Sequence, residues 1–269
     1  MQGVRATSLI ERISRVWRGR PVATVEPAAP PLPGRVRGVV DHVIILDGTL
    51  STLKPGDETN CGLLLKLLQD EGRGVHRRIY YEQGLQWEGM RHAFGFLQGR
   101  GINRQIMRAY GWLASQYRPG DRIYLFGYSR GAYAVRSLSG VIDRVGLVRR
   151  EVATERVIRQ AYRHYRQGPA SDAAQAFGRA HCHLESPIEM VGVWDTVKAL
   201  GLRLPLLWML SDKHHRFHNH HLGSSILHGF QALALHETRA VFEPVMWDCP
   251  PGWEGNVQQV WFRGGHSDV

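Results

Sequence analysis

The feature that constrains this chain most is Gly127-x-Ser129-x-Gly131, within the stretch "RIYLFGYSRGAY". The apolar run over 122–129 predicts a buried strand, and the pattern over 130–146 predicts a helix. A serine between small residues at a strand-to-helix turn is the pattern of a nucleophile elbow, which lifts the serine hydroxyl above the sheet. The small residues are needed because such a turn packs closely against neighbouring backbone. The alternative is a structural turn serine.

Two places in the sequence are candidates for an oxyanion hole. The predicted helix after the elbow begins at Arg130, whose N–H lies at the positive end of the helix dipole. An early apolar run, "VVDHVIIL", is followed by Asp47, Gly48 and Thr49. In an elbow-bearing fold the loop after an early strand supplies the second donor, here the Gly48 or Thr49 N–H. Asp47 either fixes this loop through side-chain hydrogen bonds or forms a simple Asx-type turn.

A serine nucleophile needs a base, and the base needs an acid that orients it. The usual order along the chain is Ser, Asp, His, which Ser129, Asp195 and His266 follow. Asp195 and His266 each come at or just after the end of an apolar run, where open α/β sheets place their sites. Asp195 could instead cap a helix, and His266 could be a solvated loop residue. Asp248 and Asp268 are weaker candidates for the acid.

The pattern of apolar residues alternates between strands and helices, which predicts an α/β fold, α/β-hydrolase-like, with a mostly parallel sheet and helices on both faces. The predicted strands cover 39–46, 77–84, 122–129, 188–197 and 257–269, and the predicted helices cover 61–72, 103–117, 130–146, 151–180 and 224–239. Residues 1–36 are basic and then proline-rich, which predicts a tail and linker before a domain at 37–269. Residues 1–20 would form either a short basic amphipathic helix or a frayed tail.

Charge and composition narrow the partners. The net charge is +10 and the isoelectric point about 9.9, which favours anionic partners and is compatible with peripheral contact with an anionic membrane. The basic residues are spread along the chain without interleaved aromatic residues, so no nucleic-acid partner is expected. Cys61, Cys182 and Cys249 show no CxxC spacing and are expected to be buried free thiols in a reducing compartment. The sequence indicates no oligomeric state.

Three further function classes are disfavoured by the sequence. The histidine-rich stretch 212–221 lacks carboxylates at fixed spacing, so a solvated loop is favoured over a metal site, and no cofactor is expected. Asp47-Gly48-Thr49 resembles the first motif of aspartate-nucleophile phosphatases, but Ile45 stands where the paired carboxylate would be. No apolar run reaches the roughly 18 residues of a membrane-spanning helix, and no secretory signal is visible.

Five blocks of this sequence resemble, in order, the α/β-hydrolase domain family that includes type VI secretion phospholipase effectors of the first class. They are "VIILDGT", "YRPGDRIYLFGYSRGAYAVRSLSGVI", "VGVWDTV", "HGFQALALHETRAVFEPVMW" and "VWFRGGHSDV". The resemblance covers roughly residues 38–269 and implies hydrolysis of ester bonds, with phospholipase A activity in the effector branch. It also implies a place in the cytoplasm, or secretion without a signal peptide by contact-dependent delivery.

By the same resemblance, Ser129 is the nucleophile, Asp195 the acid and His266 the base, and the loop at Asp47 borders the oxyanion hole. The chain departs from the family at His236, where an acidic residue is usual, and it ends at residue 269, where family members continue. These departures raise the alternative of a C-terminally short, weakly active or inactive domain that serves as an accessory or interaction protein. In an active enzyme, the apolar segment "LRLPLLWML" at 202–210 would be a lid or an acyl-chain wall.

Overall fold

The computed structural model describes residues 38–71, 76–84, 100–197, 222–249 and 252–269. All of them belong to one unit, Leu32–Val269. The predictions for the N-terminal tail, for the apolar segment 202–210 and for the histidine-rich segment 212–221 concern residues outside these ranges. Those three predictions therefore remain predictions.

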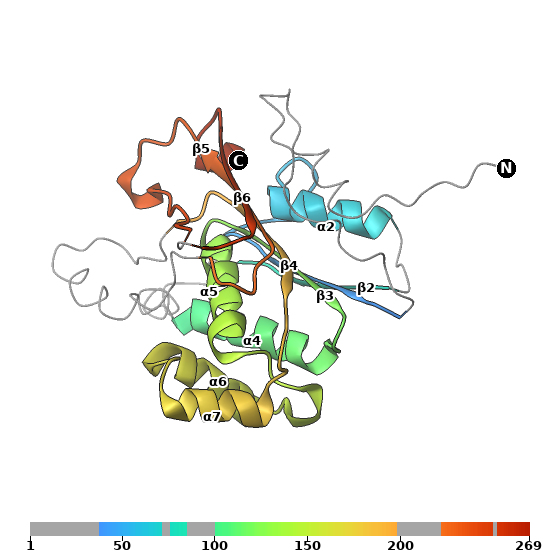
Figure 1. The fold of residues 1–269 in the computed structure, drawn as a ribbon. Coiled ribbons are helices and arrows are strands. Elements are labelled where there is room, and N and C mark those ends of the chain that lie inside the picture. The colour runs from blue at the N-terminus through green and yellow to red at the C-terminus, as the bar shows by residue number, and fades with distance from the viewer. Residues whose placement is uncertain (1–37, 72–75, 85–99, 198–221, 250–251) are drawn as a thin grey trace. The chain divides into compact units, whose positions relative to one another are not determined.

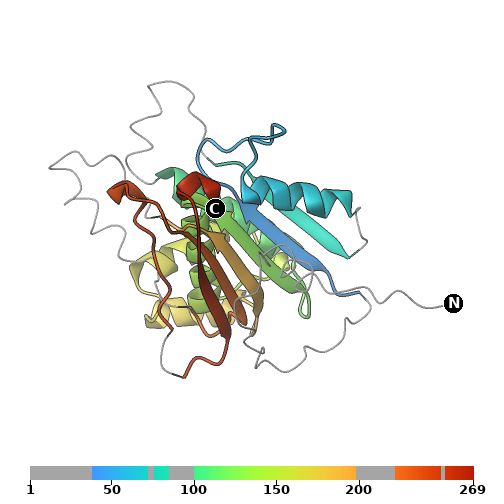
Figure 2. The ribbon, with the colours of Figure 1, turned by 90° about the horizontal axis from the view of Figure 1, so that it is seen from above.

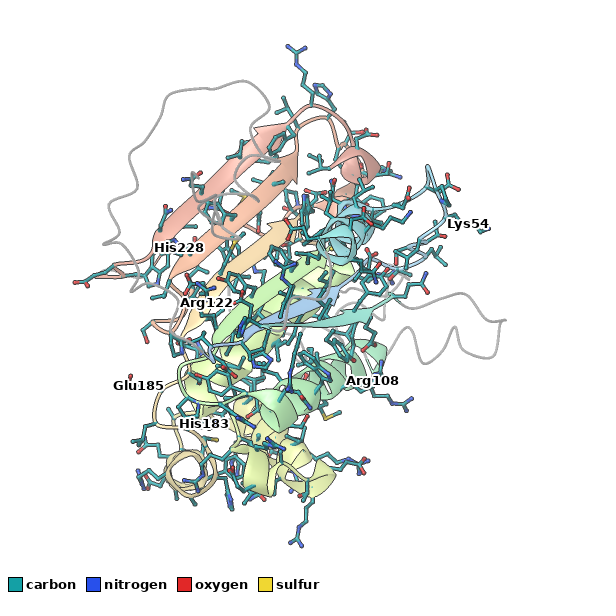
Figure 3. The ribbon with its side chains drawn as sticks, turned by 90° about the vertical axis from the view of Figure 1, so that its right-hand side faces the viewer. Lys54, Arg108, Arg122, His183, Glu185 and His228 are labelled. Carbon is teal, nitrogen blue, oxygen red and sulfur yellow. The ribbon has the colours of Figure 1, made fainter. Side chains whose placement is uncertain are left out.

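A six-stranded parallel sheet forms the centre of this unit. Its strands are β1 (Asp41–Leu46), β2 (Arg77–Glu82), β3 (Arg122–Tyr128), β4 (Ile188–Trp194), β5 (His228–Ala234) and β6 (Asn256–Phe262). The strand order is β2-β1-β3-β4-β5-β6, and every neighbouring pair is parallel. Because all strands run the same way, their carboxyl ends lie along one edge of the sheet, the edge on which Lys54 lies in Figure 3.

Helices cover both faces of the sheet, which confirms the predicted α/β architecture (Figures 1 and 2). The helix α2 lies on one face and α4 and α5 on the other, with α6 and α7 packed outside them. Their bounds are Asn60–Asp70 for α2, Arg100–Gln116 for α4, Arg130–Val145 for α5, Glu155–Gln167 for α6 and Asp172–His181 for α7. The described ranges also contain the short 3-10 helices η1 (Arg150–Val152), η2 (Ala240–Phe242) and η3 (His266–Asp268).

The apolar sequences of β1, β4 and α5 agree with their burial in the structure. The strands β1 and β4 are buried along their whole length, as expected of parallel strands covered on both faces. The helix α5 carries alanine, valine, leucine and isoleucine side chains and is buried over most of its surface. It packs against β1, β3 and β4, so the helix that begins at Ser129 is anchored along the centre of the sheet.

A buried arginine ties α5 to the segment after η2. Arg136 donates to the carbonyl oxygens of Val245 and Met246 and to Gln231 Oε1, and its guanidinium lies 5.0 Å from the Trp247 ring centroid. Burial lowers the pKa of Arg136, yet its donors are used by oxygen acceptors. The elbow helix is thereby tied to β5 and to the segment after η2.

Two predicted helices differ in the structure. The stretch 151–180 contains η1 and two helices, α6 and α7, and the break falls at Gly168, whose φ is 153°. Pro169 disfavours helical backbone at the residue before it, and Ser171 caps the next helix.

The prediction of a helix over 224–239 is wrong, because the centre of that stretch is strand β5. It pairs with β4 and β6 and is almost completely buried, so pairing in the sheet overrides its helical composition.

The cysteine prediction is correct in part. Cys61 and Cys182 are buried and all three cysteines are free thiols, but Cys249 is exposed. Cys249 lies in the segment between η2 and β6, and its side chain is outside the core. The prediction that all three thiols are buried is therefore wrong at Cys249.

Candidate active site

Ser129 stands at a strained turn between β3 and α5. Its backbone has φ 56° and ψ −120°, a region that a non-glycine residue rarely occupies. The Ser129 N–H donates to the Trp194 carbonyl oxygen at 3.0 Å, which ties the turn to the end of β4. This strand–turn–helix geometry is the context that the motif requires of a nucleophile elbow. Strain of this kind persists only where the surrounding structure fixes it.

The two glycines of the motif are required by close packing. A Cβ at Gly131 would lie 2.1 Å from the Leu46 carbonyl oxygen, and a Cβ at Gly127 would lie 2.6 Å from the Gly131 oxygen. Both contacts are with backbone atoms, which cannot move aside without displacing β1 or the turn itself. The prediction that small residues are needed here is therefore confirmed.

The structure brings Ser129, Asp195 and His266 together. His266 Nε2 lies 2.7 Å from Ser129 Oγ, and His266 Nδ1 lies 2.5 Å from Asp195 Oδ2. All three side chains are buried, and they come from the carboxyl ends of β3 and β4 and from the segment after β6. The hydrogen-bonded order serine, histidine, aspartate is the arrangement in which an imidazole can take the serine proton while the carboxylate orients it.

Hydrogen bonds tie Asp195 to the end of β5. Its N–H donates to the Ala232 oxygen at 2.8 Å, and its Oδ1 accepts the Ala234 N–H at 3.2 Å. The stretch that Asp195 would cap as a helix lies, from residue 198 onward, outside the described residues. His266 is buried and is no solvated loop residue. Asp268 Oδ2 accepts the Gly265 N–H at 2.7 Å, and so serves the turn that carries His266.

The loop after β1 is fixed by Asp47. The Asp47 carboxylate is buried and accepts the Gly48 N–H at 2.7 Å, the Thr59 hydroxyl at 2.8 Å and the Tyr81 hydroxyl at 2.8 Å. Burial raises the pKa of Asp47, and these donors oppose the rise. Because Tyr81 lies on β2 and Thr59 caps α2, the carboxylate joins three elements and does more than form an Asx turn.

The two predicted oxyanion donors of this loop, the Gly48 and Thr49 N–H groups, differ in their hydrogen bonding. The Gly48 N–H is already used by Asp47, whereas no acceptor for the Thr49 N–H is found in the described part of the chain. Thr49 is therefore the better placed of the two for a developing oxyanion. The N–H of Arg130 belongs to the first turn of α5, at the positive end of the helix dipole. Burial lowers the pKa of the Arg130 side chain to about 10.

Gly84 is a supporting residue that sequence reasoning missed. A Cβ there would lie 1.9 Å from the Gly48 oxygen and 2.6 Å from the Thr49 nitrogen. The chain after β2 therefore passes directly against the loop that carries the candidate oxyanion donors. A glycine after a predicted strand is a signal of close backbone approach, but the sequence does not say which backbone it approaches.

The departure from the family at His236 has a structural role of its own. His236 Nδ1 accepts the Gly264 N–H at 3.2 Å, and the His236 N–H donates to the Gly264 oxygen at 2.9 Å. These two contacts hold the segment after β5 against the segment that leads to His266. The imidazole thus replaces an acidic side chain without leaving the His266 segment unsupported.

No metal site appears among the described residues, where no three His, Cys, Asp or Glu side chains are grouped to hold an ion. Within the same ranges, no helix is both long and apolar enough to cross a bilayer.

The parallel sheet, the strained serine and the serine–histidine–aspartate contacts together define a protein of the α/β-hydrolase type. A sequence model of the family described as "T6SS, Phospholipase effector Tle1-like, catalytic domain" matches residues 41–269. The chain therefore belongs to the family of Tle1-like catalytic domains of type VI secretion phospholipase effectors.

The individual relatives have low sequence identity to this chain and are longer than it is. "Uncharacterized protein YEL023C" of Saccharomyces cerevisiae is 28% identical over 186 residues, which are 60% of this chain and 27% of the yeast protein. An uncharacterized protein from Pseudomonas aeruginosa has a crystal structure that matches with 17% identity and a TM-score of 0.45, over 86% of this chain and 41% of that one. The Tle1 effector bound to the VgrG spike of the type VI secretion system matches with 18% identity and a TM-score of 0.43, over 87% and 51%. The chain thus spans about half or less of each of these relatives.

Proposed function

We propose that this chain is a serine hydrolase that cleaves a carboxylic ester bond of phospholipids, with phospholipase A-type activity. The observation that supports it most is the contact of His266 with both the Ser129 hydroxyl and the Asp195 carboxylate. Membership in the Tle1-like catalytic domain family supports the phospholipid as the substrate class. No metal or cofactor has a part in the reaction that we propose.

The proposed reaction has two halves. His266 Nε2 takes the Ser129 proton as Oγ attacks the ester carbonyl, and Asp195 stabilises the imidazolium that forms. The N–H groups of Arg130 and Thr49 would hold the negative oxygen of the tetrahedral intermediate. His266 then gives its proton to the departing alcohol, a lysophospholipid, which leaves an acyl group on Ser129. In the second half, water deprotonated by His266 attacks the acyl-enzyme and releases the fatty acid.

Exposed apolar side chains near the site support a substrate that is presented by a lipid surface. Leu50 and Leu53 lie in the loop after β1, and Leu235 and Val241 lie in the segment after β5. In the strand order these two strands flank β3 and β4, whose carboxyl ends carry Ser129 and Asp195. Leu50 is 57% exposed and has φ 62°, a strained backbone for a leucine.

The charges in the loop after β1 do not favour one sign. Lys54 is exposed, as is Asp57, and Glu58 pairs with Lys66. We therefore propose that apolar contact contributes more to lipid binding at this side of the site than attraction to anionic head groups. The net charge of +10 belongs to the chain as a whole and does not place a basic surface here.

The proposed activity is tested by product analysis. Purified protein is incubated with vesicles of a diacyl phospholipid whose two acyl chains differ in length, and the products are separated by mass spectrometry. We expect one free fatty acid and one lysophospholipid in equal amounts, and the fatty acid released identifies the acyl position. Release of diacylglycerol or of the head group would show a phosphoester cleavage and would contradict the proposal.

Replacing the exposed apolar residues should affect lipid surfaces more than dissolved substrate. We expect Leu50→Asp combined with Val241→Asp to lower hydrolysis of vesicle phospholipid by about tenfold, because two apolar contacts with the surface are lost. Hydrolysis of a short, water-soluble ester should fall much less. The matched control is Leu184→Asp, since Leu184 is also exposed but lies before β4, toward the opposite edge of the sheet. Equal losses on both substrates would show that the two residues serve the fold and not the lipid surface.

The accessory-protein alternative has less support. It depended on His236 and on a poorly held base, but His236 bonds to Gly264 and the imidazole of His266 lies within hydrogen-bond distance of both partners. We also propose that this domain acts as part of a type VI effector, delivered into a target cell by contact-dependent secretion. Family membership is what supports that delivery.

A further inference from the structure

We propose that Arg239, an exposed residue in the segment after β5, is a positioning residue for His266 and acts through Glu237 and Phe242. The proposal rests on the proposed function, in which His266 is the base. Arg239 is not among the predicted site residues, and its side chain bonds to Glu237 and lies over the Phe242 ring rather than against Ser129, Asp195 or His266.

The first connection runs through Phe242. The Phe242 ring stacks on the His266 imidazole, with ring centroids 4.4 Å apart and an interplanar angle of 22°. The Arg239 guanidinium lies 4.3 Å from the Phe242 ring centroid. A guanidinium over an aromatic face is attracted by the ring and limits how far that ring can move. Arg239 therefore restrains the aromatic surface against which the imidazole rests.

The second connection runs through Glu237. Glu237 Oε2 accepts the backbone N–H of His266 at 3.1 Å. Arg239 binds the same carboxylate with three donors: its backbone N–H at 2.8 Å, Nε at 2.8 Å and an Nη at 2.7 Å. The fork of Arg239 holds the pKa of Glu237 well below its usual range. The carboxylate thus stays ionised and oriented, with an oxygen available to the His266 backbone.

The other side of His266 is held by Tyr128. Its ring stacks on the imidazole at 5.1 Å, and its hydroxyl donates to the His266 carbonyl oxygen at 2.9 Å. Tyr128 belongs to β3 and directly precedes Ser129, so its position is fixed by the same turn that fixes Ser129. Glu237 and Phe242 belong to the segment after β5. Arg239 contacts both Glu237 and Phe242, and so links the two contacts that this segment makes with His266.

Small displacements of a base are costly in catalysis. A misplacement of about 1 Å can cost about a hundredfold in rate, because the proton must pass between fixed atoms. Loss of Arg239 should therefore lower kcat while leaving the binding of a small soluble ester nearly unchanged. If Arg239 served only the fold, its loss would lower thermal stability and leave the kcat of the folded protein nearly unchanged.

The test compares two arginines of similar exposure, each paired with a glutamate. Arg239→Met removes the guanidinium fork and keeps a side chain of similar length, and Arg239→Lys keeps the charge but loses the planar fork. The control is Arg159→Met, because Arg159 is 66% exposed, close to the 60% of Arg239, and also pairs with a glutamate, Glu155, on α6.

We expect kcat for a water-soluble ester to fall by about tenfold or more in Arg239→Met, with KM within about twofold of wild type. Arg239→Lys should recover part of the loss, and Arg159→Met should match wild type. Thermal denaturation establishes that each variant is folded. A kcat in folded Arg239→Met equal to that of Arg159→Met would overturn the proposal. Should Arg239→Met fail to fold, the kcat of Arg239→Lys against Arg159→Lys decides in the same way.

A second measurement does not depend on turnover. The proton between His266 Nδ1 and Asp195 gives a downfield signal in the proton NMR spectrum when the two groups are held together. We expect this signal in wild type and Arg159→Met, and a broadened or absent signal in Arg239→Met. A wild type that shows the signal but hydrolyses no ester would overturn the proposed function and leave the role of Arg239 standing. An unchanged signal in Arg239→Met would count against the role of Arg239 whatever the activity.

Discussion

Replacing Ser129 with alanine is expected to lower ester turnover by about a million-fold. The hydroxyl is the only group of Ser129 that contacts His266, and alanine keeps the backbone of the elbow without supplying a nucleophile. The rate is measured as acid released from a water-soluble ester. Binding of the substrate and thermal stability should change little, because no core volume is lost.

The matched control for this variant is Ser139→Ala. Ser139 is also buried, lies on α5 nearly three turns beyond the elbow, and donates to the Arg136 carbonyl oxygen at 2.8 Å. We expect Ser139→Ala to retain most of the activity. Substantial turnover in folded Ser129→Ala would mean that another residue performs the attack.

The second large effect is expected for Asp195→Asn, with a loss in kcat of about ten-thousand-fold. The amide is close in size to the carboxylate, so its oxygen can still accept the Ala234 N–H, but it cannot stabilise an imidazolium at His266 Nδ1. The loss should appear in kcat and in kcat/KM together, because the interaction strengthens only as His266 takes a proton.

Asp268→Asn is the control for the acid, since Asp268 was the rival candidate near His266. Its carboxylate accepts the Gly265 N–H, a contact that an asparagine oxygen can also make. We expect a loss of less than about tenfold, because the turn that carries His266 keeps its hydrogen bond. A loss in Asp268→Asn as large as that in Asp195→Asn would show that the acid has been assigned to the wrong residue.

The elbow could be predicted because its signal is local. A buried strand, a serine between glycines and a helix follow one another within 24 residues, and the steric reason for each glycine is a property of that turn. Asp195 and His266 were found by their places at the ends of apolar runs and by chain order. These predictions needed the parallel architecture but not the detailed register of the sheet.

The strand β5 was missed because its sequence carries no strand period. It is buried on both faces, so polar and apolar residues do not alternate, and its alanine and leucine favour a helix. The error had a consequence for the site: the end of β5 supplies the Ala232 oxygen and the Ala234 N–H that hold Asp195. A helix over 224–239 would not place these backbone groups beside the end of β4, where Asp195 lies.

The supports of His266 could not be read from the sequence for a different reason. Glu237 and Phe242 contact a residue more than twenty positions further along the chain, and only the pairing of β5 with β6 brings the two segments together. Gly84 likewise meets the loop at Gly48 because β2 pairs with β1. Tertiary contacts of this kind leave no pattern within either segment.

The most direct test of the account is the reaction of the folded protein with a fluorophosphonate probe, followed by intact mass measurement and mapping of the modified residue. We expect wild type to gain one adduct, on Ser129, and His266→Ala to react at least a hundredfold more slowly, since a serine without its base is a weak nucleophile. An adduct on another serine, or no adduct on the folded wild-type protein, would contradict the claim that Ser129 is a nucleophile activated by His266.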